Sequence, residues 1–176
     1  NDRFLNTLLV SAPGCGKTTL LRYIVRQVSE GNPYGTGRQV GVVDERSEIA
    51  GSFMGTPQND VGIRTDVLDG CPKVQGMMLL MRSMAPSVVA VDEIGGCEDL
   101  RAVYQILQCG SSVIATMHGS TMEDVQRHMY FSEENGLLFD RFLFLERKQG
   151  LCRVREIIDG RQKKVIWGLE QKTCYV

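Results

Sequence analysis

The sequence predicts one α/β domain with a mostly parallel central sheet flanked by helices and an antiparallel hairpin near its C-terminal end. The first observation is that short apolar runs alternate with segments of helical periodicity, as in strands joined by crossover helices. The second is composition, because 43% of the 176 residues are hydrophobic and 23% are charged. Such a chain can bury a sizeable core, which excludes disordered, collagen-like and disulfide-stabilised miniprotein classes.

The N-terminal part is expected to form a strand, a glycine-rich turn and a helix. Residues 7–11 are an apolar run, and apolar side chains recur at helical spacing over 18–30. A second strand is expected over 39–43, where the apolar run ends in several charged residues. Residues 51–72 are rich in glycine, proline, asparagine and aspartate, so we expect a long functional loop there.

The alternation of strands and helices continues through the rest of the chain. We expect helices over 73–84, 98–108 and 122–130, and strands over 87–91 and 112–116. Residues 142–146 and 152–158 are typical of a hairpin, and a third strand is expected over 164–167. Basic residues outnumber acidic ones near the end, so 140–176 is expected to be a basic, β-rich extension of a single domain spanning 1–176.

A glycine-rich segment between the first strand and the first helix has the pattern of a phosphate-binding loop. It runs Ser11-Ala12-Pro13-Gly14-Cys15-Gly16-Lys17-Thr18 and departs from G-x-x-x-x-G-K-[ST] only at Ser11. Glycines let backbone N–H groups surround phosphates, Lys17 reaches the β and γ oxygens, and Thr18 offers a hydroxyl to Mg²⁺. The alternative is a chance match in an ordinary turn. The residues expected to bind ATP are Pro13, Gly14, Cys15, Gly16, Lys17, Thr18 and Thr19.

The apolar run 88–91 ends in two carboxylates, which is the form of a Walker B segment. Asp92 is expected to hold Mg²⁺, and Glu93 to orient or deprotonate the attacking water. The alternative is a pair of exposed acids at a strand end. A glutamate directly after the aspartate favours hydrolysis over phosphoryl transfer to another substrate. Together with the loop 11–18, the acid pair predicts a Mg²⁺-dependent ATPase.

Polar residues at two further strand ends extend the predicted site. Asp44, Glu45 and Glu48 follow the second strand, at the sheet edge where ligands bind in open α/β folds. They could face the γ-phosphate or serve as helix caps and salt-bridge partners. Thr116 and His118 end another strand, where they could report the presence of a γ-phosphate. The alternative for His118 is a purely structural role.

Two arginines are candidates for action on a nucleotide held by a neighbouring subunit. Arg46 and Arg64 lie on or beside the polar loop, where a guanidinium could reach across a subunit boundary. Salt bridges within the chain are the alternative.

Several other classes of site and partner lack support in the sequence. Six scattered cysteines without a C-x-x-C pair exclude zinc and redox motifs of that spacing and suit a reducing cytosol. No basic stripe interleaved with aromatic side chains points to nucleic acid. The runs of consecutive apolar residues are all far shorter than the roughly 20 residues that a membrane-spanning helix needs, so we expect no transmembrane segment in this chain.

Four stretches resemble one known family in particular. They are 42–51, 57–68, Met81-Arg82 with Pro86, and 91–95. On these residues the chain resembles the stage III sporulation protein AA family, P-loop ATPases of endospore-forming bacteria that are related to type II and type IV secretion ATPases. The resemblance runs from about Leu8 to Ile158.

The resemblance implies a RecA-like ATPase domain without the N-terminal domain of that family. It makes 11–19 the P-loop, Asp44-Glu45 with Glu48 similar to an aspartate box, Asp92-Glu93 similar to Walker B, and 116–118 similar to a histidine box. Secretion ATPases usually end Walker B in Gly-Glu and order the aspartate box Glu-Asp. The division of catalytic work between Glu45 and Glu93 therefore stays open, with Glu93 as the first choice.

The resemblance further implies a hexameric ring with ATP at subunit boundaries. It also implies a cytoplasmic location at the membrane, on the mother-cell side of a channel around the forespore, with the channel proteins as partners. The leading hypothesis is an ATPase that drives assembly of, or transport through, this channel. Two rivals are a nucleotide-gated scaffold with little turnover and a small-molecule P-loop kinase.

Overall fold

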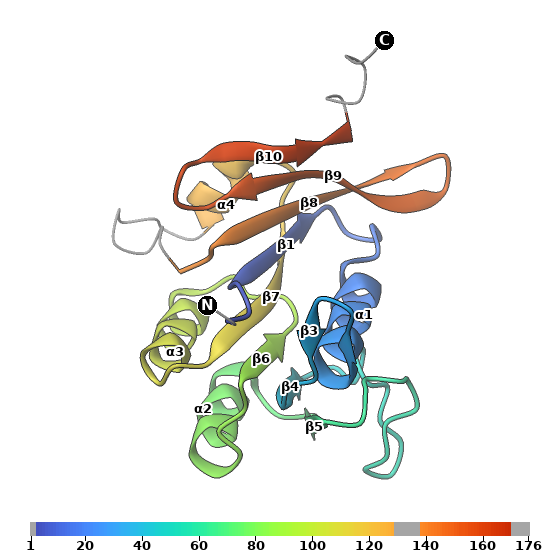
Figure 1. The fold of residues 1–176 in the computed structure, drawn as a ribbon, viewed down its shortest axis with the longest axis vertical. Helices are drawn as coiled ribbons and strands as arrows, with labels where there is room; N and C mark the ends of the chain where they lie inside the picture. Colours follow the sequence, from blue (N-terminus) through green and yellow to red (C-terminus); the bar gives the residue numbers. More distant parts are fainter. Residues whose placement is uncertain (1–2, 129–137, 170–176) are drawn as a thin grey trace.

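The computed structural model describes residues 3–128 and 138–169. Its main feature is an eight-stranded sheet in the order β10-β9-β8-β1-β7-β6-β4-β5 (Figure 1). The strands are β1 (Thr7–Ser11), β4 (Val40–Asp44), β5 (Thr65–Asp69), β6 (Val88–Val91), β7 (Ser112–His118), β8 (Arg141–Lys148), β9 (Leu151–Asp159) and β10 (Lys164–Gly168). The short strands β2 (Gly31–Asn32) and β3 (Gly35–Thr36) pair separately.

Most of the sheet is parallel. The strands β8, β1, β7, β6, β4 and β5 pair in parallel, whereas β9 runs antiparallel to β8 and β10 antiparallel to β9. The prediction of a mostly parallel sheet with an antiparallel hairpin near its C-terminal end is therefore confirmed, including the third strand. The strands β8, β9 and β10 of the C-terminal segment belong to the same sheet, because β8 pairs with β1.

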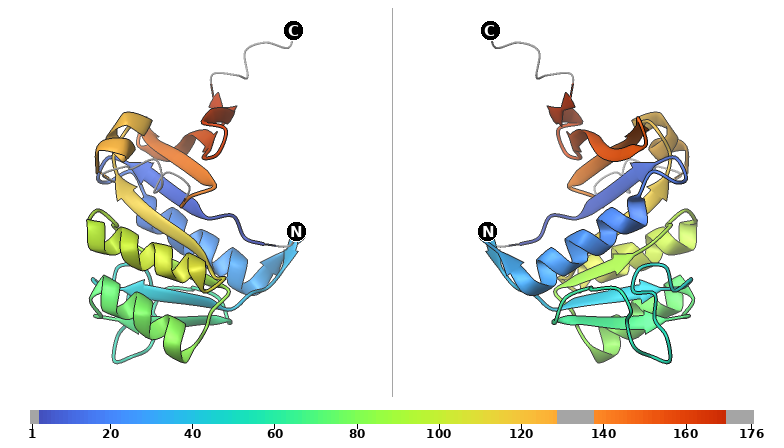
Figure 2. Two further views of the ribbon diagram at one scale, coloured as in Figure 1. Left: turned by 90° about the vertical axis from the view of Figure 1, so that its left-hand side faces the viewer. Right: turned by 90° about the vertical axis from the view of Figure 1, so that its right-hand side faces the viewer.

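Helices cover both faces of the sheet (Figures 1 and 2). The helix α1 (Lys17–Glu30) packs on one face, and α2 (Lys73–Ser83) and α3 (Cys97–Gln108) pack on the other. The side chains of β1 show how this is encoded, since Leu9 joins the core under α1 while Leu8 and Val10 join the core under α2 and α3. A strand covered on both faces needs apolar side chains on both, which explains the consecutive apolar residues Leu8, Leu9 and Val10.

The structure differs from the sequence prediction in the segment 51–72, which is not a continuous loop. Its end forms β5, the parallel edge strand beside β4. This strand has the sequence TDVLD and is only half-buried, so it lacks the apolar run by which the inner strands were recognised. The last predicted helix is α4 (Met122–His128), and the remaining predicted positions 129 and 130 lie outside the described residues.

Two glycines allow α2 to approach β4 closely. A Cβ atom on Gly76 would lie 2.6 Å from Cγ1 of Val43, and one on Gly41 would lie 2.9 Å from Cδ1 of Leu80. Val43 is almost fully buried and β-branched, so it has little freedom to move away. The approach of α2 matters for the site because the first residue of this helix, Lys73, reaches the carboxyl edge of the sheet.

We predict that Gly76→Ala lowers the free energy of unfolding by about 1–3 kcal/mol, because the added methyl group overpacks the contact with Val43. Alanine is the better helix former, so propensity alone would change stability in the opposite direction. Urea denaturation measures the effect. Gly35→Ala is the control, since nothing lies within 4 Å of the added atom, and a Gly76→Ala protein as stable as this control would contradict the packing argument.

Candidate functional site

The carboxyl ends of four parallel strands gather the predicted site at one edge of the sheet. The register pairs Ser11 of β1 with His118 of β7, and Val91 of β6 with Val43 of β4. Residues that directly follow these strands must therefore lie side by side. They border a central cavity of about 380 Å³, lined by Pro13, Gly14, Gly16, Lys17, Thr18, Thr19, Glu48, Glu93 and His118.

The loop 11–18 is shaped by two glycines in the left-handed region. Gly14 has φ 72° and Gly16, the N-cap of α1, has φ 77°, values that L-residues with side chains rarely adopt. Ser11, the departure from the expected pattern, is fully buried, and its hydroxyl donates to the carbonyl oxygen of Ala12 at 2.9 Å. Serine at this position is therefore built into the turn and does not distort it.

Lys17 is buried at the base of the central cavity. Its Nζ donates to the carbonyl oxygens of Ser11 at 3.0 Å and Ala12 at 3.2 Å, and lies 3.1 Å from Nδ1 of His118. Burial lowers the pKa of the Lys17 amine, although the nearby Asp92 carboxylate partly offsets this. An ammonium group has only donors, so a hydrogen bond from Lys17 requires Nδ1 of His118 as the acceptor and leaves Nε2 to donate to Glu93.

The carboxylate of Asp92 connects three elements. It accepts a hydrogen bond from the Thr18 hydroxyl of α1 at 2.7 Å and another from the Thr116 hydroxyl of β7. Thr116 is fully buried and in turn accepts the backbone N–H of Glu93 at 2.8 Å. The structure thus places Thr116 behind the acid pair, where it holds Asp92 and Glu93, and not among the side chains that line the central cavity.

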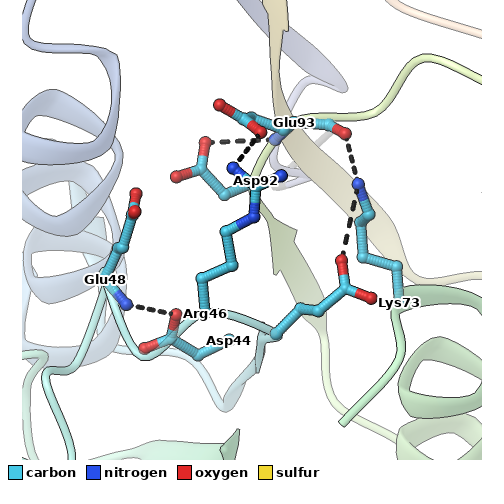
Figure 3. Close-up of a pocket in the computed structure, with 7 residues that line it drawn as sticks. Asp44, Arg46, Glu48, Lys73, Asp92 and Glu93 are labelled. Atoms are coloured by element: carbon cyan, nitrogen blue, oxygen red, sulfur yellow. Dashed lines mark hydrogen bonds and ion pairs between the residues drawn. The ribbon is translucent and has the colours of Figure 1, made fainter. Parts of the chain in front are cut away.

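Glu93 projects into the cavity from an unusual backbone conformation. Its φ is 52°, which costs a non-glycine residue about 1–3 kcal/mol and persists only where neighbours enforce it. Its carboxylate lies 2.9 Å from Nε2 of His118. It also lies 2.9 Å from Nη1 of Arg46 (Figure 3). Burial would raise the pKa of the Glu93 carboxyl, but the His118 hydrogen bond and the Arg46 and Lys73 charges outweigh it and lower the pKa.

Lys73 is a site residue that the sequence analysis missed. Its Nζ donates to the backbone carbonyl of Glu93 at 2.5 Å and lies 3.7 Å from Oε2 of Glu45 (Figure 3). This bond, with the one from Thr116, fixes both peptide groups of the strained residue. Lys73 was missed because the sequence analysis did not predict β5. This strand runs parallel to β4 and ends on the same side of the sheet, so the helix that follows it begins beside the acid pair.

Asp44 shapes the segment that follows β4. Asp44 is only 2% exposed, and its carboxylate accepts hydrogen bonds from the backbone N–H groups of Glu48, Ile49 and Ala50 at 2.8–3.1 Å. The chain therefore turns back toward α1, and Glu48 comes to line the central cavity. Glu45 does not line that cavity and lies instead beside Lys73, in a smaller space of about 20 Å³ that Asp92 and Glu93 also border.

The two candidate arginines lie far apart. Arg46 pairs with Glu93 within the chain, and its side chain is 65% exposed. Arg64 directly precedes β5, so it lies at the amino ends of the parallel strands, away from the predicted site. There its backbone N–H and its guanidinium donate hydrogen bonds to Ser29 near the end of α1. The structure thus brings Arg46, and not Arg64, to the acid pair of its own chain. Action of either arginine on a neighbouring subunit stays a prediction.

The comparisons with known proteins agree with this geometry. The chain matches the family described as "Sporulation stage III, protein AA" over residues 1–165. It belongs to this family. It is 45% identical over 176 residues to Stage III sporulation protein AA of Bacillus subtilis. The matched region covers 98% of this chain and 57% of that protein. The chain therefore spans little more than half the length of this relative.

Solved structures of secretion ATPases share the fold. The ATPase DotB of Legionella pneumophila superimposes with a TM-score of 0.66 and 18% identity, over 89% of this chain and 46% of DotB. The VirB11 ATPase of the Brucella suis type IV secretion system gives a TM-score of 0.61 and 16% identity, over 93% and 50%. At this identity the likeness concerns the fold alone, and it confirms the prediction of a RecA-like P-loop fold.

We predict that His118→Phe and Arg46→Met each raise the pKa of the Glu93 carboxyl, because each removes a group that favours the ionised form. A ¹³C NMR titration of the Glu93 Cδ resonance measures this, with Arg101→Met, an exposed change on α3, as control. Since the folded-state pKa of Glu93 is lowered, its stabilising contribution is present above the ordinary glutamate pKa and is lost as pH falls through the folded value. An unchanged pKa in both variants would contradict the assigned contacts.

Proposed function

We propose that this domain binds Mg²⁺-ATP and hydrolyses it. The observation that carries the proposal is that Lys17, Thr18, Glu93 and His118 line one cavity and are joined by side-chain contacts that include Asp92. A chance G-K-T turn would not bring a buried lysine, a hydroxyl-bonded aspartate and a projecting glutamate together. This convergence therefore favours a nucleotide site over an ordinary loop.

The donor groups fit a magnesium nucleotide. Gly14 and Gly16, whose backbones are in the left-handed region, shape the loop whose N–H groups would bind the phosphates. The buried Lys17 would supply positive charge. The oxygens of Thr18 and Asp92 already lie 2.7 Å apart, and hydroxyl and carboxylate oxygens are the ligands that Mg²⁺ prefers. When bound, Mg²⁺ would neutralise charge that develops on the phosphates.

Glu93 is our choice for the group that orients and deprotonates the attacking water. It projects into the cavity with the loop 11–18, whereas Glu45 lies outside that cavity beside Lys73. A carboxylate paired with two partners is a weak base. We therefore infer that Glu93 must leave Arg46 before it accepts a proton, while His118 reports the γ-phosphate through its link to Lys17 and Thr116 keeps the acid pair in place.

The biological setting follows from the family and stays a proposal for this chain. We propose that 1–176 is one ATPase domain, that its copies form a ring, and that Arg46 or Arg64 completes the site of a neighbour. The ring would act in the cytoplasm on the mother-cell side of a membrane-spanning sporulation channel and drive its assembly or transport. No helix among residues 3–128 and 138–169 is long and apolar enough to cross a membrane.

A nucleotide-gated scaffold is the second candidate function. The observation that favours it is the Arg46–Glu93 pair, which leaves the proposed base engaged in the structure of the single chain. If that pair persists after ATP binds, the domain would bind nucleotide and assemble with little turnover. A Glu93→Gln protein that still supports assembly in sporulating cells would favour the scaffold over the motor.

We predict that Lys17→Ala abolishes both ATP binding and turnover. Glu93→Gln should keep ATP affinity within about threefold of the wild-type value. It should lower turnover by about 10²–10⁴-fold, which is the usual contribution of a general base. Phosphate release and nucleotide titration measure the two effects. Glu98→Gln, an exposed change on α3 away from both cavities, serves as the control for loss of a carboxylate. Unchanged turnover in both site variants would sink the ATPase proposal.

We predict that Lys73→Met lowers kcat by about tenfold or more and leaves KM within about threefold, because small misplacements of reacting groups cost up to about 10²-fold. Lys73→Arg keeps a cation near the Glu93 carbonyl and should recover part of the rate. The matched control is Lys164→Met, an exposed lysine on β10. If Lys73→Met lowers only the unfolding midpoint and not kcat of the folded protein, Lys73 does not position Glu93.

A further inference from the structure

A second cavity adjoins the loop 11–18 on the side away from the acid pair. This lateral cavity has a volume of about 460 Å³ and lies between the start of α1 and the hairpin β8–β9. It shares Gly16 and Thr19 with the central cavity, so the two spaces meet at these residues. Its lining consists of Cys15, Gly16, Thr19, Leu20, Tyr23, Leu145, Cys152, Arg153 and Val154.

The hairpin forms a fixed wall of the lateral cavity. A Cβ atom on Gly16 would lie 3.2 Å from both Cβ and Sγ of Cys152, so the hairpin packs directly against the loop. On the opposite side, α1 contributes Leu20 and Tyr23, whose ring is exposed. An exposed aromatic ring beside apolar side chains is a surface on which a planar heterocycle can stack.

The direction of a bound nucleotide follows from the two ends of the central cavity. Glu93 and His118 mark the end where the terminal phosphate would react, and Gly16 and Thr19 mark the end shared with the lateral cavity. A triphosphate with its γ-phosphate beside Glu93 must direct its nucleoside away from Glu93. It then enters the lateral cavity. This step rests on the proposed nucleotide site.

The lining offers little that could distinguish one purine from another. None of the lateral-cavity residues named above has an amide or carboxylate side chain, the groups that read base edges through fixed donors and acceptors. The one charged member, Arg153, has its guanidinium engaged by Glu146 at 2.6–2.7 Å. Recognition by shape and stacking tolerates any base of the right size.

We infer that the lateral cavity holds the nucleobase and ribose, and that it binds adenine and guanine nucleotides with similar affinity. The base contacts the hairpin and the outer side of α1, and the phosphates bind in the loop 11–18. The β-rich segment near the C-terminal end thereby forms part of the nucleotide site, a role that its sequence motifs do not indicate.

Calorimetric titration of the full chain with Mg²⁺ and three probes tests this inference. The probes are ATP, GTP and inorganic tripolyphosphate, which carries the phosphates without a nucleoside. Tyr23→Ala should weaken ATP and GTP binding by about fivefold or more, since stacking on one aromatic side chain typically contributes that much. Tripolyphosphate affinity should not change, and wild-type affinities for ATP and GTP should agree within about threefold. Tyr104→Ala, at a tyrosine of α3 that is also exposed, is the control.

A second variant keeps the test decisive if the loss of Tyr23 is tolerated. Val154→Trp fills the lateral cavity from the hairpin and should weaken both nucleotides but not tripolyphosphate. The inference is overturned if ATP binds and neither variant affects it, or if wild-type protein prefers ATP over GTP by more than about a hundredfold, the discrimination of a site with fixed polar contacts. If neither ATP nor tripolyphosphate binds, the proposed nucleotide site itself fails.

Discussion

The carboxylate of Asp92 is the group on which the geometry of the site depends. It follows β6, and it accepts hydrogen bonds from Thr18 at the start of α1 and Thr116 on β7. These partners come from segments 74 and 24 residues away in sequence. One half-buried carboxylate with donors from two other elements fixes their relative positions, because a hydrogen bond to a charged group contributes about 1.5–3 kcal/mol. The loop 11–18 and the acid pair are thereby held at a constant separation.

Glu93 combines a rigid backbone with a side chain that can be released. The bonds from Thr116 and Lys73 hold its peptide groups in the left-handed conformation. The Arg46 side chain that pairs with its carboxylate is 65% exposed, and exposed ion pairs contribute only about 0–1 kcal/mol. A polyanionic ligand or a neighbouring subunit can therefore draw Arg46 away at little cost. This difference suits a group that must keep its place while it changes its partner.

Sequence patterns predicted the interior of the fold better than its edges. The strands β1, β6 and β7 are covered on both faces, so their apolar runs could be recognised without long-range information. The edge strand β5 has only two apolar residues, placed between aspartates, and was interpreted as part of a loop. The position of Lys73 was missed for the same reason. Motif spacing predicted that Lys17, Thr18, Asp92, Glu93 and His118 share one site, and the structure brings them together. Motif spacing could not show that Thr116 lies behind the acid pair or that Glu48, and not Glu45, lines the central cavity. It also could not show that Arg64 lies at the amino ends of the strands. These positions depend on how the chain turns between strands.

The central claim is that this domain is an ATPase whose sites are completed between subunits. The most direct measurement is phosphate release from Mg²⁺-ATP across a range of protein concentrations, with mass determination on the same samples. The account predicts a specific activity that rises together with a ring-sized species, because an arginine from a neighbour would then reach the nucleotide. A specific activity that does not depend on concentration, measured on a monomer, would contradict shared sites. Tight ATP binding without phosphate release in fully assembled protein would contradict the motor and leave the scaffold.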